Sequence, residues 1–375
     1  MKAVVYDGIK SVKIIDAKEP SIKKADDLII RVTSTAICGS DLHIYHGMVP
    51  NLPKGFIIGH EAVGIVEEAG PDIRNIKKGD RVLVPFTIAC DHCRFCDEGL
   101  YSQCDNSNHK AAVGAVFGYG ENFGSYAGAQ AQYLRVPYAN VGPRAVPEEL
   151  SDEQALLLTD VLPTAYWAVE TAGVKAGDVV VILGCGPIGL NAIKWVIFAG
   201  AKRIIAVDYV SYRLVHAAGY GVEAVNLTEH DDCGEYINEI TGGGADTVID
   251  CVGADGKMTK LELLESLLRL QGGSKSAIEI AVGAVRKGGC IVLAGVYGMR
   301  YNMFPLGDLF SKNISLKMGI CPAQAYVDRI MRMIIENKIK ATDIITHTLP
   351  LAMAPYAYEI FDKKEDNCIK VVMKP

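Results

Sequence analysis

The sequence predicts an α/β protein with a β-rich domain and a second domain built on a doubly wound parallel sheet. The chain has 375 residues, which is longer than one hydrophobic core usually organises. Its first part alternates short apolar runs with Gly, Pro and Asp, which is typical of antiparallel strands. Its middle carries a continuous apolar run followed at once by closely spaced glycines, which is typical of a buried parallel strand. We expect the β-rich domain at 1–155 and 300–375 and the parallel sheet at 156–299.

Composition and charge narrow the classes of function. Hydrophobic residues make up 50% of the chain and charged residues 22%, so an ordinary packed core is expected. The formal net charge of −6 argues against a nucleic-acid-binding surface, which usually carries a basic excess. The N-terminus lacks the apolar core of a signal peptide, and no segment approaches the ~18 apolar residues of a membrane span. We therefore expect a cytoplasmic protein without nucleic-acid or membrane partners.

The β-rich domain is expected to consist of short strands separated by turns. Each expected strand is an apolar run bounded by Gly, Pro or Asp. These runs lie at 3–6, 12–15, 28–32, 62–67, 77–85 and 133–136.

The segment between the third and fourth of these runs contains side chains suited to metal binding. Cys38-Gly-Ser40-Asp41-Leu-His43 and Gly59-His60-Glu61 hold a thiol, two imidazoles and two carboxylates between glycines. Such side chains bind zinc and transfer protons. A buried free cysteine and a surface histidine are each common without a function, so this segment predicts a metal site only together with the rest of the chain.

Residues 90–104 contain the most specific local pattern, Cys-x2-Cys-x2-Cys-x7-Cys, formed by Cys90, Cys93, Cys96 and Cys104. Two-residue gaps let thiolates of a turning loop face a common centre, and the fourth thiolate completes a tetrahedron. The pattern predicts a structural zinc site, because four protein ligands leave no open coordination position. An iron–sulfur cluster is a weaker alternative. A zinc ribbon that reads nucleic acid is weaker still, because Arg94 stands alone among acidic residues of the loop.

The apolar run at 178–183 leads into Gly184-Cys-Gly186-Pro187-Ile188-Gly189, then an expected helix and strand, and then Asp208. Strand, glycine turn, helix, strand and acid in this order are the context that a Rossmann dinucleotide fingerprint requires. The glycines let the backbone approach a pyrophosphate at the helix N-terminus. Asp208 would accept from both ribose hydroxyls and repel a 2′-phosphate, so the pattern predicts NAD rather than NADP.

The remaining elements alternate between helix and strand. Ser151 is expected to cap a helix, since acidic residues follow it in the first turn. Further helices are expected at 164–171, 190–198, 214–218, 232–241, 261–270, 277–285 and 324–337, and a helix or loop at 306–310. Further strands are expected at 203–207, 225–227, 245–250, 290–296, 314–318 and 369–373. The stretch between Asp250 and Gly288 is too long for one crossover helix and predicts an insertion.

Taken together, these motifs resemble the zinc-dependent medium-chain dehydrogenases, the alcohol dehydrogenase family, along essentially the whole chain. The resemblance rests on the 38–43 and 59–61 motifs, the four-cysteine loop, and the glycine turn with Asp208. It implies a GroES-like catalytic domain made of both chain ends, with a Rossmann domain inserted between them. It also implies two zinc ions, one catalytic and one structural.

By this resemblance Cys38 and His60 would bind the catalytic zinc. The family's usual third ligand is a cysteine, but Asp160 stands at the corresponding place with no cysteine near it. A carboxylate is an acceptable zinc ligand, and the glutathione-independent formaldehyde dehydrogenases and some bacterial secondary-alcohol enzymes look similar here. The insertion at 257–287 also resembles the former group. Glu61 would approach the metal or support its ligands, and the alternative for Asp160 is an ordinary carboxylate at a helix terminus.

The resemblance also implies a path for protons and a set of cofactor contacts. Ser40 would take the proton of the alcohol and pass it through the ribose to His43, while Asp41 would orient His60. As alternatives, Ser40 is a loop cap and His43 a solvated surface residue. The expected cofactor contacts are Thr164 at the nicotinamide, Arg213 at the adenosine ribose and Lys370 at the pyrophosphate. For Arg213 and Lys370 the alternative is a solvated charge.

The expected function is an NAD-dependent, zinc-dependent dehydrogenase that reversibly oxidises a small alcohol to an aldehyde or ketone. Within that class, a formaldehyde dehydrogenase, an aldehyde dismutase, and a threonine or polyol dehydrogenase remain open. A non-catalytic nucleotide-binding or redox-sensing protein on the same fold is a different class, and a zinc-stapled nucleic-acid binder is a third. We expect a homotetramer or homodimer.

Overall fold

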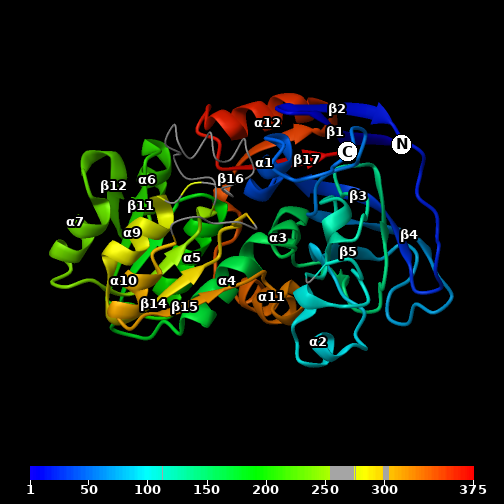
Figure 1. Ribbon diagram of the computed structural model, residues 1–375. Helices are drawn as coiled ribbons and strands as arrows, with labels where there is room; N and C mark the ends of the chain where they lie inside the picture. Colours follow the sequence, from blue (N-terminus) through cyan, green and yellow to red (C-terminus); the bar gives the residue numbers. More distant parts are fainter. Residues whose placement is uncertain (112, 254–273, 275, 299–303) are drawn as a thin grey trace. The chain divides into compact units, whose positions relative to one another are not determined.

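A computed structural model describes the whole chain except residues 112, 254–273, 275 and 299–303 (Figure 1). The chain forms two compact units. Unit 1 comprises Met1–Pro163 and Pro322–Pro375, and unit 2 comprises Thr164–Cys321. The expected boundaries at 155 and 300 therefore need correction. The second boundary moves because β15 (Ser315–Met318) pairs in parallel with β14 (Val285–Leu293) and thereby belongs to the sheet of unit 2. The expected helix at 261–270 lies outside the described residues.

Unit 1 is β-rich and contains both ends of the chain. Its main sheet has, among the described residues, seven strands in the order β16-β17-β3-β4-β5-β9, with β8 paired to β3. The strands are β3 (Leu28–Ala36), β4 (Ala62–Ala69), β5 (Arg81–Val84), β8 (Tyr133–Val136), β9 (Arg144–Ala145), β16 (Ile345–Pro350) and β17 (Lys370–Lys374). Two small antiparallel sheets of two strands each pair β1 (Lys2–Gly8) with β2 (Ser11–Asp16), and β6 (Thr87–Ile88) with β7 (Ala115–Val116). Because β17 pairs antiparallel with β3, the C-terminal tail joins the first domain as expected.

The helices of unit 1 lie between its strands. They are α1 (Gly39–Tyr45), α2 (Arg94–Asp97), α3 (Asp152–Leu157), α11 (Val327–Ile335) and α12 (Ala354–Lys363). Ser151 caps α3 as expected, accepting from the Gln154 backbone N–H in a capping box. Helix α4 (Val161–Ala172) begins three residues earlier than expected and contains Pro163 in its first turn. Proline is tolerated there, because N–H groups of the first turn have no partner within the helix. Helix α12 was not expected from the sequence.

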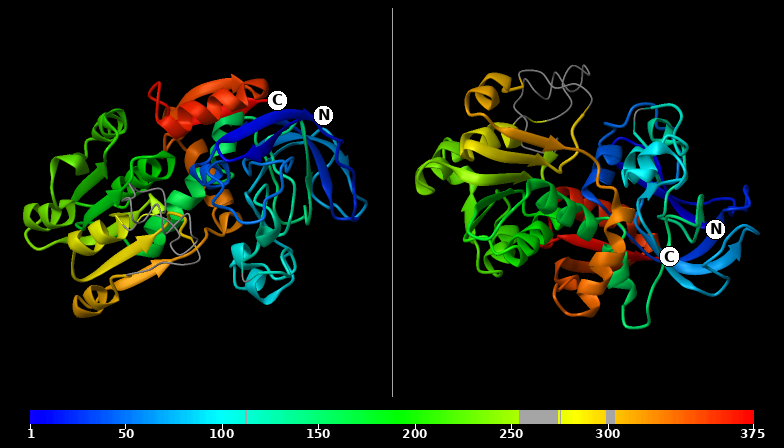
Figure 2. Two further views of the ribbon diagram at one scale, coloured as in Figure 1. Left: turned by 45° about the horizontal axis from the view of Figure 1, so that its top comes forward. Right: turned by 90° about the horizontal axis from the view of Figure 1, so that it is seen from below.

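Unit 2 contains a parallel sheet, which has six strands in its described part, in the order β12-β11-β10-β13-β14-β15. Figure 2 shows these strands side by side, coloured from green to orange. The other strands are β10 (Val179–Leu183), β11 (Arg203–Asp208), β12 (Glu223–Asn226) and β13 (Ala245–Asp250). The helices are α5 (Pro187–Phe198), α6 (Ser211–Ala218), α7 (Cys233–Ile240), α9 (Ser276–Ala284) and α10 (Leu306–Ser311). The strand order reverses between β10 and β13, which is the switch point where doubly wound sheets bind nucleotides.

The cores of both units follow from the apolar runs in the sequence. In unit 2, Val180–Leu183 and Ile204–Val207 are buried along their whole length, as expected for parallel strands covered on both faces. In unit 1, β3 buries Leu28, Ile30 and Val32 against neighbouring strands. Among the described residues, we find no helix long and apolar enough to cross a membrane.

Candidate active site

The four cysteines of the 90–104 loop converge in the structure. Their sulfur atoms lie within 4.8 Å of one another, and the Sγ–Sγ distance is 4.0 Å for Cys90–Cys96 and 3.9 Å for Cys93–Cys104. Tetrahedral zinc with Zn–S bonds of about 2.3 Å separates its sulfurs by roughly 3.8 Å, so the geometry fits zinc. All eleven cysteines of the chain are described, and all are free thiols. Metal binding therefore accounts for this cluster better than a disulfide does.

Polar groups around this loop favour the thiolate form. Asn106 Nδ2 donates to Cys90 Sγ over 3.1 Å. Burial alone would raise the pKa of Cys93, but backbone N–H donors at Cys96 and Asp105 outweigh it and lower the pKa to about 7. At Cys90 and Cys96, by contrast, burial outweighs the hydrogen bonds and raises the pKa, so the thiolate that binds metals is favoured at Cys93 and not at these two.

A second cluster brings together the ligand atoms of Cys38, His60, Glu61 and Asp160, which lie within 4.8 Å of one another. The pairing of β3 with β4 explains most of this convergence. Thr35 faces Ala62 in the two strands, so residues that follow β3 meet residues that precede β4. Cys38 caps the N-terminus of α1 after β3, and His60 and Glu61 lie directly before β4. Asp160 arrives from a third segment, directly before α4.

The charges of this second cluster fit a divalent cation. The carboxylates of Asp41, Glu61 and Asp160 and the ammonium of Lys370 are all buried there. With His60 neutral, as a metal-binding imidazole is, three carboxylates against one ammonium in the described residues leave an excess of two negative charges, before the thiol of Cys38 is counted. Buried charges require compensation, and one divalent cation supplies it. Glu61 Oε2 has no hydrogen-bond partner among the described residues, so it is free to face such an ion.

Lys370 does not lie where the sequence led us to expect it. Its ammonium is fully buried, and Nζ donates to Glu61 Oε1 over 2.5 Å and to the Ile37 carbonyl over 3.0 Å. Burial would lower the pKa of Lys370, but the charge of Glu61 outweighs it, and the pKa is raised. The expected contact with a pyrophosphate is therefore corrected: Lys370 is neither a surface charge nor an available anion ligand. The pairing of β17 with β3 places it beside the end of β3.

His60 is oriented with one ring nitrogen toward each side of the cluster. Nδ1 lies 3.2 Å from Asp41 Oδ1, and Nε2 lies 3.4 Å from Asp160 Oδ2. Asp41 Oδ1 and His60 Nδ1 are within ion-pair distance, but neither atom makes a hydrogen bond among the described residues. The expectation that Asp41 orients His60 by accepting from it stays a prediction. Burial would lower the pKa of His60, but Asp41 and Asp160 outweigh it and raise the pKa well above its usual value.

Ser40 and His43 both lie on α1. Ser40 Oγ is 3.5 Å from His60 Nε2, and the backbone carbonyl of Ser40 accepts from the Tyr119 hydroxyl over 2.5 Å. His43 follows Ser40 by three residues, which is close to one helical turn. Its side chain is only 6% exposed, so the alternative of a solvated surface histidine is wrong. The proposed passage of a proton between the two residues stays a prediction.

The glycine turn of unit 2 has the shape of a phosphate cradle. Gly184 has φ +86°, a conformation that favours glycine. A Cβ on Gly189 would overlap the carbonyl oxygen of Gly184, so a side chain there is excluded. Gly186 caps helix α5, and Pro187 is its first residue. The turn follows β10 at the sheet's switch point, where the N-terminus of α5 favours an anion.

Asp208 and Arg213 lie beside this turn. The Asp208 carboxylate accepts from the backbone N–H groups of Cys185, Tyr209 and Val210 over 2.7 to 2.9 Å. Arg213 Nη1 would lie 3.7 Å from a Cβ on Gly186, and its buried Nε has no hydrogen-bond partner among the described residues. The alternative of a solvated Arg213 is thereby disfavoured. Thr164 is the fourth residue of α4, and its contact with a nicotinamide stays a prediction.

Comparisons with known proteins agree with this geometry. Residues 24–148 match the family described as the alcohol dehydrogenase GroES-like domain, and residues 187–266 match the family described as zinc-binding dehydrogenase. An uncharacterized zinc-type alcohol dehydrogenase-like protein of Bacillus subtilis is 53% identical over 100% of both chains. The chain belongs to the zinc-type alcohol dehydrogenase family. The predicted fold, a GroES-like domain with a Rossmann-type parallel sheet, is confirmed.

Other members of the alcohol dehydrogenase family are similar along almost their whole length. A glutathione-independent formaldehyde dehydrogenase of Bacillus subtilis is 33% identical over 96% of this chain and 94% of its own. The solved alcohol dehydrogenase of Thermus sp. ATN1 is 33% identical, with a TM-score of 0.86 over 100% of this chain and 99% of its own. This chain is therefore an oxidoreductase of the alcohol dehydrogenase family, and its four-cysteine loop fits the family's structural zinc.

The structure adds residues that the sequence did not single out. Gln130 and Tyr358 join Asp41 in one buried hydrogen-bonded chain. The ring of Tyr119 packs edge-on against His60, with 6.1 Å between ring centroids. Each of these residues is distant in sequence from the ligands it serves, so no local spacing could have indicated it.

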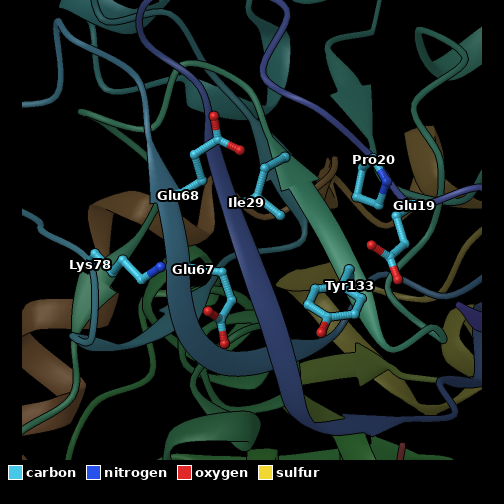
Figure 3. Close-up of a pocket in the computed structure, with 7 residues that line it drawn as sticks. All are labelled: Glu19, Pro20, Ile29, Glu67, Glu68, Lys78 and Tyr133. Carbon is cyan, nitrogen blue, oxygen red and sulfur yellow. The ribbon is translucent and has the colours of Figure 1, made fainter.

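A surface hollow of about 230 Å³ in unit 1 contains none of these residues. Two acidic side chains of β4 lie near a lysine and the ring of a tyrosine in this hollow (Figure 3). Its lining consists of Glu19, Pro20, Ile29, Glu67, Glu68, Lys78 and Tyr133. Acidic groups on a strand surface are ordinary solvated residues, and we assign no function to this hollow.

Proposed function

We propose that this alcohol dehydrogenase family member is an NAD-dependent, zinc-dependent enzyme that reversibly oxidises a small alcohol to an aldehyde or ketone. The observation that carries the proposal is the buried convergence of Cys38, His60, Asp160 and Glu61. With His60 neutral, as a metal ligand is, the buried groups there carry an excess of two negative charges. A structural zinc site needs no such excess of carboxylates. The loop at 90–104 moreover already offers four ligands for a structural zinc. The second cluster is thus the better candidate for catalysis.

The residues of this cluster suit the chemistry of alcohol oxidation. When bound, zinc supplies Lewis acidity to an alcohol oxygen, and NAD supplies the acceptor for a hydride. Cys38, His60 and Asp160 would hold the ion, with Glu61 as a further oxygen donor beside them. Asp41, whose Oδ1 lies 3.2 Å from Nδ1 of His60, would fix the orientation of that ring. The hydroxyl of Ser40, next to His60 Nε2, would accept the proton that the alcohol releases.

The choice of NAD over NADP rests on Asp208. Its buried carboxylate lies at the end of β11, beside the glycine turn. A carboxylate has about four lone-pair sites, and three backbone donors leave capacity for a ribose hydroxyl. A 2′-phosphate at the same place would meet a like charge. The unpaired Nε of Arg213 would face the same part of the nucleotide.

Formaldehyde is a second candidate substrate, either for dehydrogenation or for dismutation. Two observations favour it: the similarity to glutathione-independent formaldehyde dehydrogenases, and the carboxylate of Asp160 in place of the family's usual cysteine. A threonine or polyol dehydrogenase remains an alternative that rests on the 38–43 motif alone.

The experiment is to measure NADH formation by the zinc-loaded protein with a panel of substrates. The panel contains primary alcohols, secondary alcohols, polyols, threonine and hydrated formaldehyde, each also tested with NADP. We expect turnover with NAD for one of these groups and much slower turnover with NADP. If the protein binds two zinc ions and NAD but turns over none of them, dismutation or a non-catalytic role takes the place of this proposal.

The substrate, assembly and location expected from the sequence are also proposals. We propose a small alcohol or aldehyde as the substrate, a homotetramer or homodimer as the assembly, and the cytoplasm as the location. We propose no nucleic-acid partner and no membrane partner, in keeping with the net charge of −6.

A further inference from the structure

A buried glutamine contacts the carboxylate that orients His60. We infer that Gln130 is a positioning residue of the catalytic metal site: it holds Asp41, and Asp41 in turn holds the imidazole of His60. The inference rests on the proposed function, because it concerns the site where that function requires zinc. Five side-chain contacts of Gln130 and Asp41 carry it.

The backbone of Gln130 is fixed between two segments of unit 1. Its carbonyl accepts from the Val4 N–H over 2.8 Å, and its N–H donates to the Ile58 carbonyl over 3.0 Å. Gly59, the next residue after Ile58, has φ +89°, and a Cβ on it would overlap the side chain of Gln130. The glycine that precedes His60 therefore makes room for the glutamine.

The side-chain amide of Gln130 is fully buried, and the chemistry of its partners fixes its orientation. Nε2 donates to Asp41 Oδ2 over 3.3 Å and to the Ala36 carbonyl over 3.1 Å. Oε1 accepts from the Tyr358 hydroxyl over 2.9 Å. Two acceptors face the amide NH2, so the opposite orientation would place the amide oxygen against the Asp41 carboxylate and the Ala36 carbonyl, and both contacts would be unfavourable.

These contacts determine where the carboxylate of Asp41 points. Oδ2 accepts both from Gln130 and from the Cys38 N–H over 3.0 Å. With Oδ2 held by two donors, Oδ1 is directed at His60 Nδ1, 3.2 Å away. A carboxylate on one ring nitrogen fixes the tautomer and rotation of a metal-binding histidine. Gln130 thus acts on Nε2 through Asp41, and Tyr358 acts through Gln130.

The test compares Gln130→Met with Gln324→Met. Met has a similar length and no amide. Gln324 is a matched control, because it is buried in unit 1 and its amide hydrogen-bonds to Thr87, over 2.7 and 2.6 Å. Zinc release from each site is measured by chelator competition, and the visible spectrum is recorded with Co²⁺ in the catalytic site. We expect Gln130→Met to weaken catalytic-site zinc roughly 10-fold, since partners of metal-binding histidines contribute 10–100-fold. The Co²⁺ spectrum should change, and the zinc of the cysteine loop should be unaffected.

Two further variants test the route of the effect. In an Asp41→Asn background, Gln130→Met should cause little additional loss of zinc, because the two residues act in series. Tyr358→Phe removes only the hydroxyl that donates to Gln130, and it should also weaken zinc binding at the catalytic site. If Gln130→Met does not fold, Tyr358→Phe becomes the test of the inference.

Three results would overturn the inference. They are unchanged catalytic-site zinc in Gln130→Met and Tyr358→Phe, equal loss of both zinc ions, or the same loss in Gln324→Met. If the unaltered protein binds zinc only at the cysteine loop, the proposed function fails as well, so the two failures are distinguishable.

Discussion

The two cysteine-containing clusters of unit 1 obtain their ligands in opposite ways. In the loop cluster, all four ligands are thiols from 15 consecutive residues, 90–104. In the catalytic cluster, a thiol, an imidazole and carboxylates arrive from three segments, and Asp160 is 122 positions after Cys38 (160 − 38). The loop cluster offers a complete set of four ligands by itself, whereas the cluster proposed to be catalytic has Lys370, Asp41 and Gln130 as buried charged and polar neighbours. When ligands come from distant segments, neighbouring side chains must hold them in position, and changes in those side chains can alter how the ligands bind a metal.

The largest expected effect separates the clusters by activity. Cys38→Ala removes a ligand of the catalytic cluster, and we expect more than a roughly 100-fold loss of turnover, since loss of an outer partner alone costs 10–100-fold. The zinc content should fall from two ions per chain to one, with NAD binding retained. Undiminished turnover in Cys38→Ala would show that this cluster is not the active site.

The second effect separates the clusters by stability. Cys96 is buried in the loop cluster, and Cys96→Ser should release the loop's zinc and lower the free energy of unfolding by on the order of 5 kcal/mol, part of the ~10–16 kcal/mol with which such sites bind zinc. Turnover per folded, zinc-containing chain should change little at low temperature. Thermal unfolding and zinc content measure the first effect, and steady-state kinetics the second. A catalytic defect as large as that of Cys38→Ala would mean that the loop is part of the active site.

The third effect concerns the buried pair Lys370–Glu61. Lys370→Met leaves the Glu61 carboxylate without its ammonium, and breaking a buried pair in this way costs about 3 kcal/mol or more. We expect this destabilisation in the metal-free protein and a smaller one with zinc bound, because the cation then compensates Glu61. Denaturant unfolding with and without zinc measures the difference.

Lys374→Met is the matched control for this third effect. Lys374 lies on the same strand, is 36% exposed, and donates to Ser34 and Glu153. An exposed pair contributes roughly 0–1 kcal/mol, so this variant should unfold nearly as the unaltered protein does. Equal effects of the two substitutions would contradict the role given to Lys370.

The same comparison explains what the sequence could and could not predict. The cysteine loop and the glycine turn were predictable because two-residue gaps and strand-adjacent glycines are local patterns. Cys38, His60 and Asp160 were related only through the resemblance to a family, since their convergence depends on the pairing of β3 with β4. The boundary at 300 was misplaced because nothing local in 314–318 tells a parallel edge strand from an antiparallel one.

Contacts of buried polar side chains were the least predictable part. From the sequence alone Lys370 is expected at the surface, because lysine is almost never fully buried without a partner. Its partner Glu61 is 309 positions away in the sequence, so no local pattern indicates the pair. Gln130 and Tyr358 belong to no motif, and only the packed structure joins them to Asp41. Such supporting residues can be identified only from the packed structure, whereas metal ligands can be predicted in part from their spacing in the sequence.

The smallest expected effect tests the composition of the catalytic cluster. Asp160→Cys replaces a carboxylate with a thiolate, the family's usual third ligand. Both groups carry one negative charge and bind zinc, at about 2.0–2.2 Å for oxygen and about 2.3 Å for sulfur. We therefore expect the variant to keep two zinc ions and to turn over within roughly 10-fold of the rate of the unaltered protein. Loss of a residue that supports a metal ligand can cost up to about 100-fold, so this effect is smaller.

Asp160→Ala is the variant that makes this result informative. It removes the charge and the ligand together, so the catalytic zinc should be lost while the loop zinc remains. If Asp160→Ala keeps both ions, then Asp160 is not a ligand, and Glu61, whose Oε2 already has no partner among the described residues, is the oxygen donor instead. In that case Lys370, which holds the other oxygen of Glu61, becomes the residue that competes with the metal. The two carboxylates thus have different neighbours, and the pair of variants distinguishes which of them completes the site.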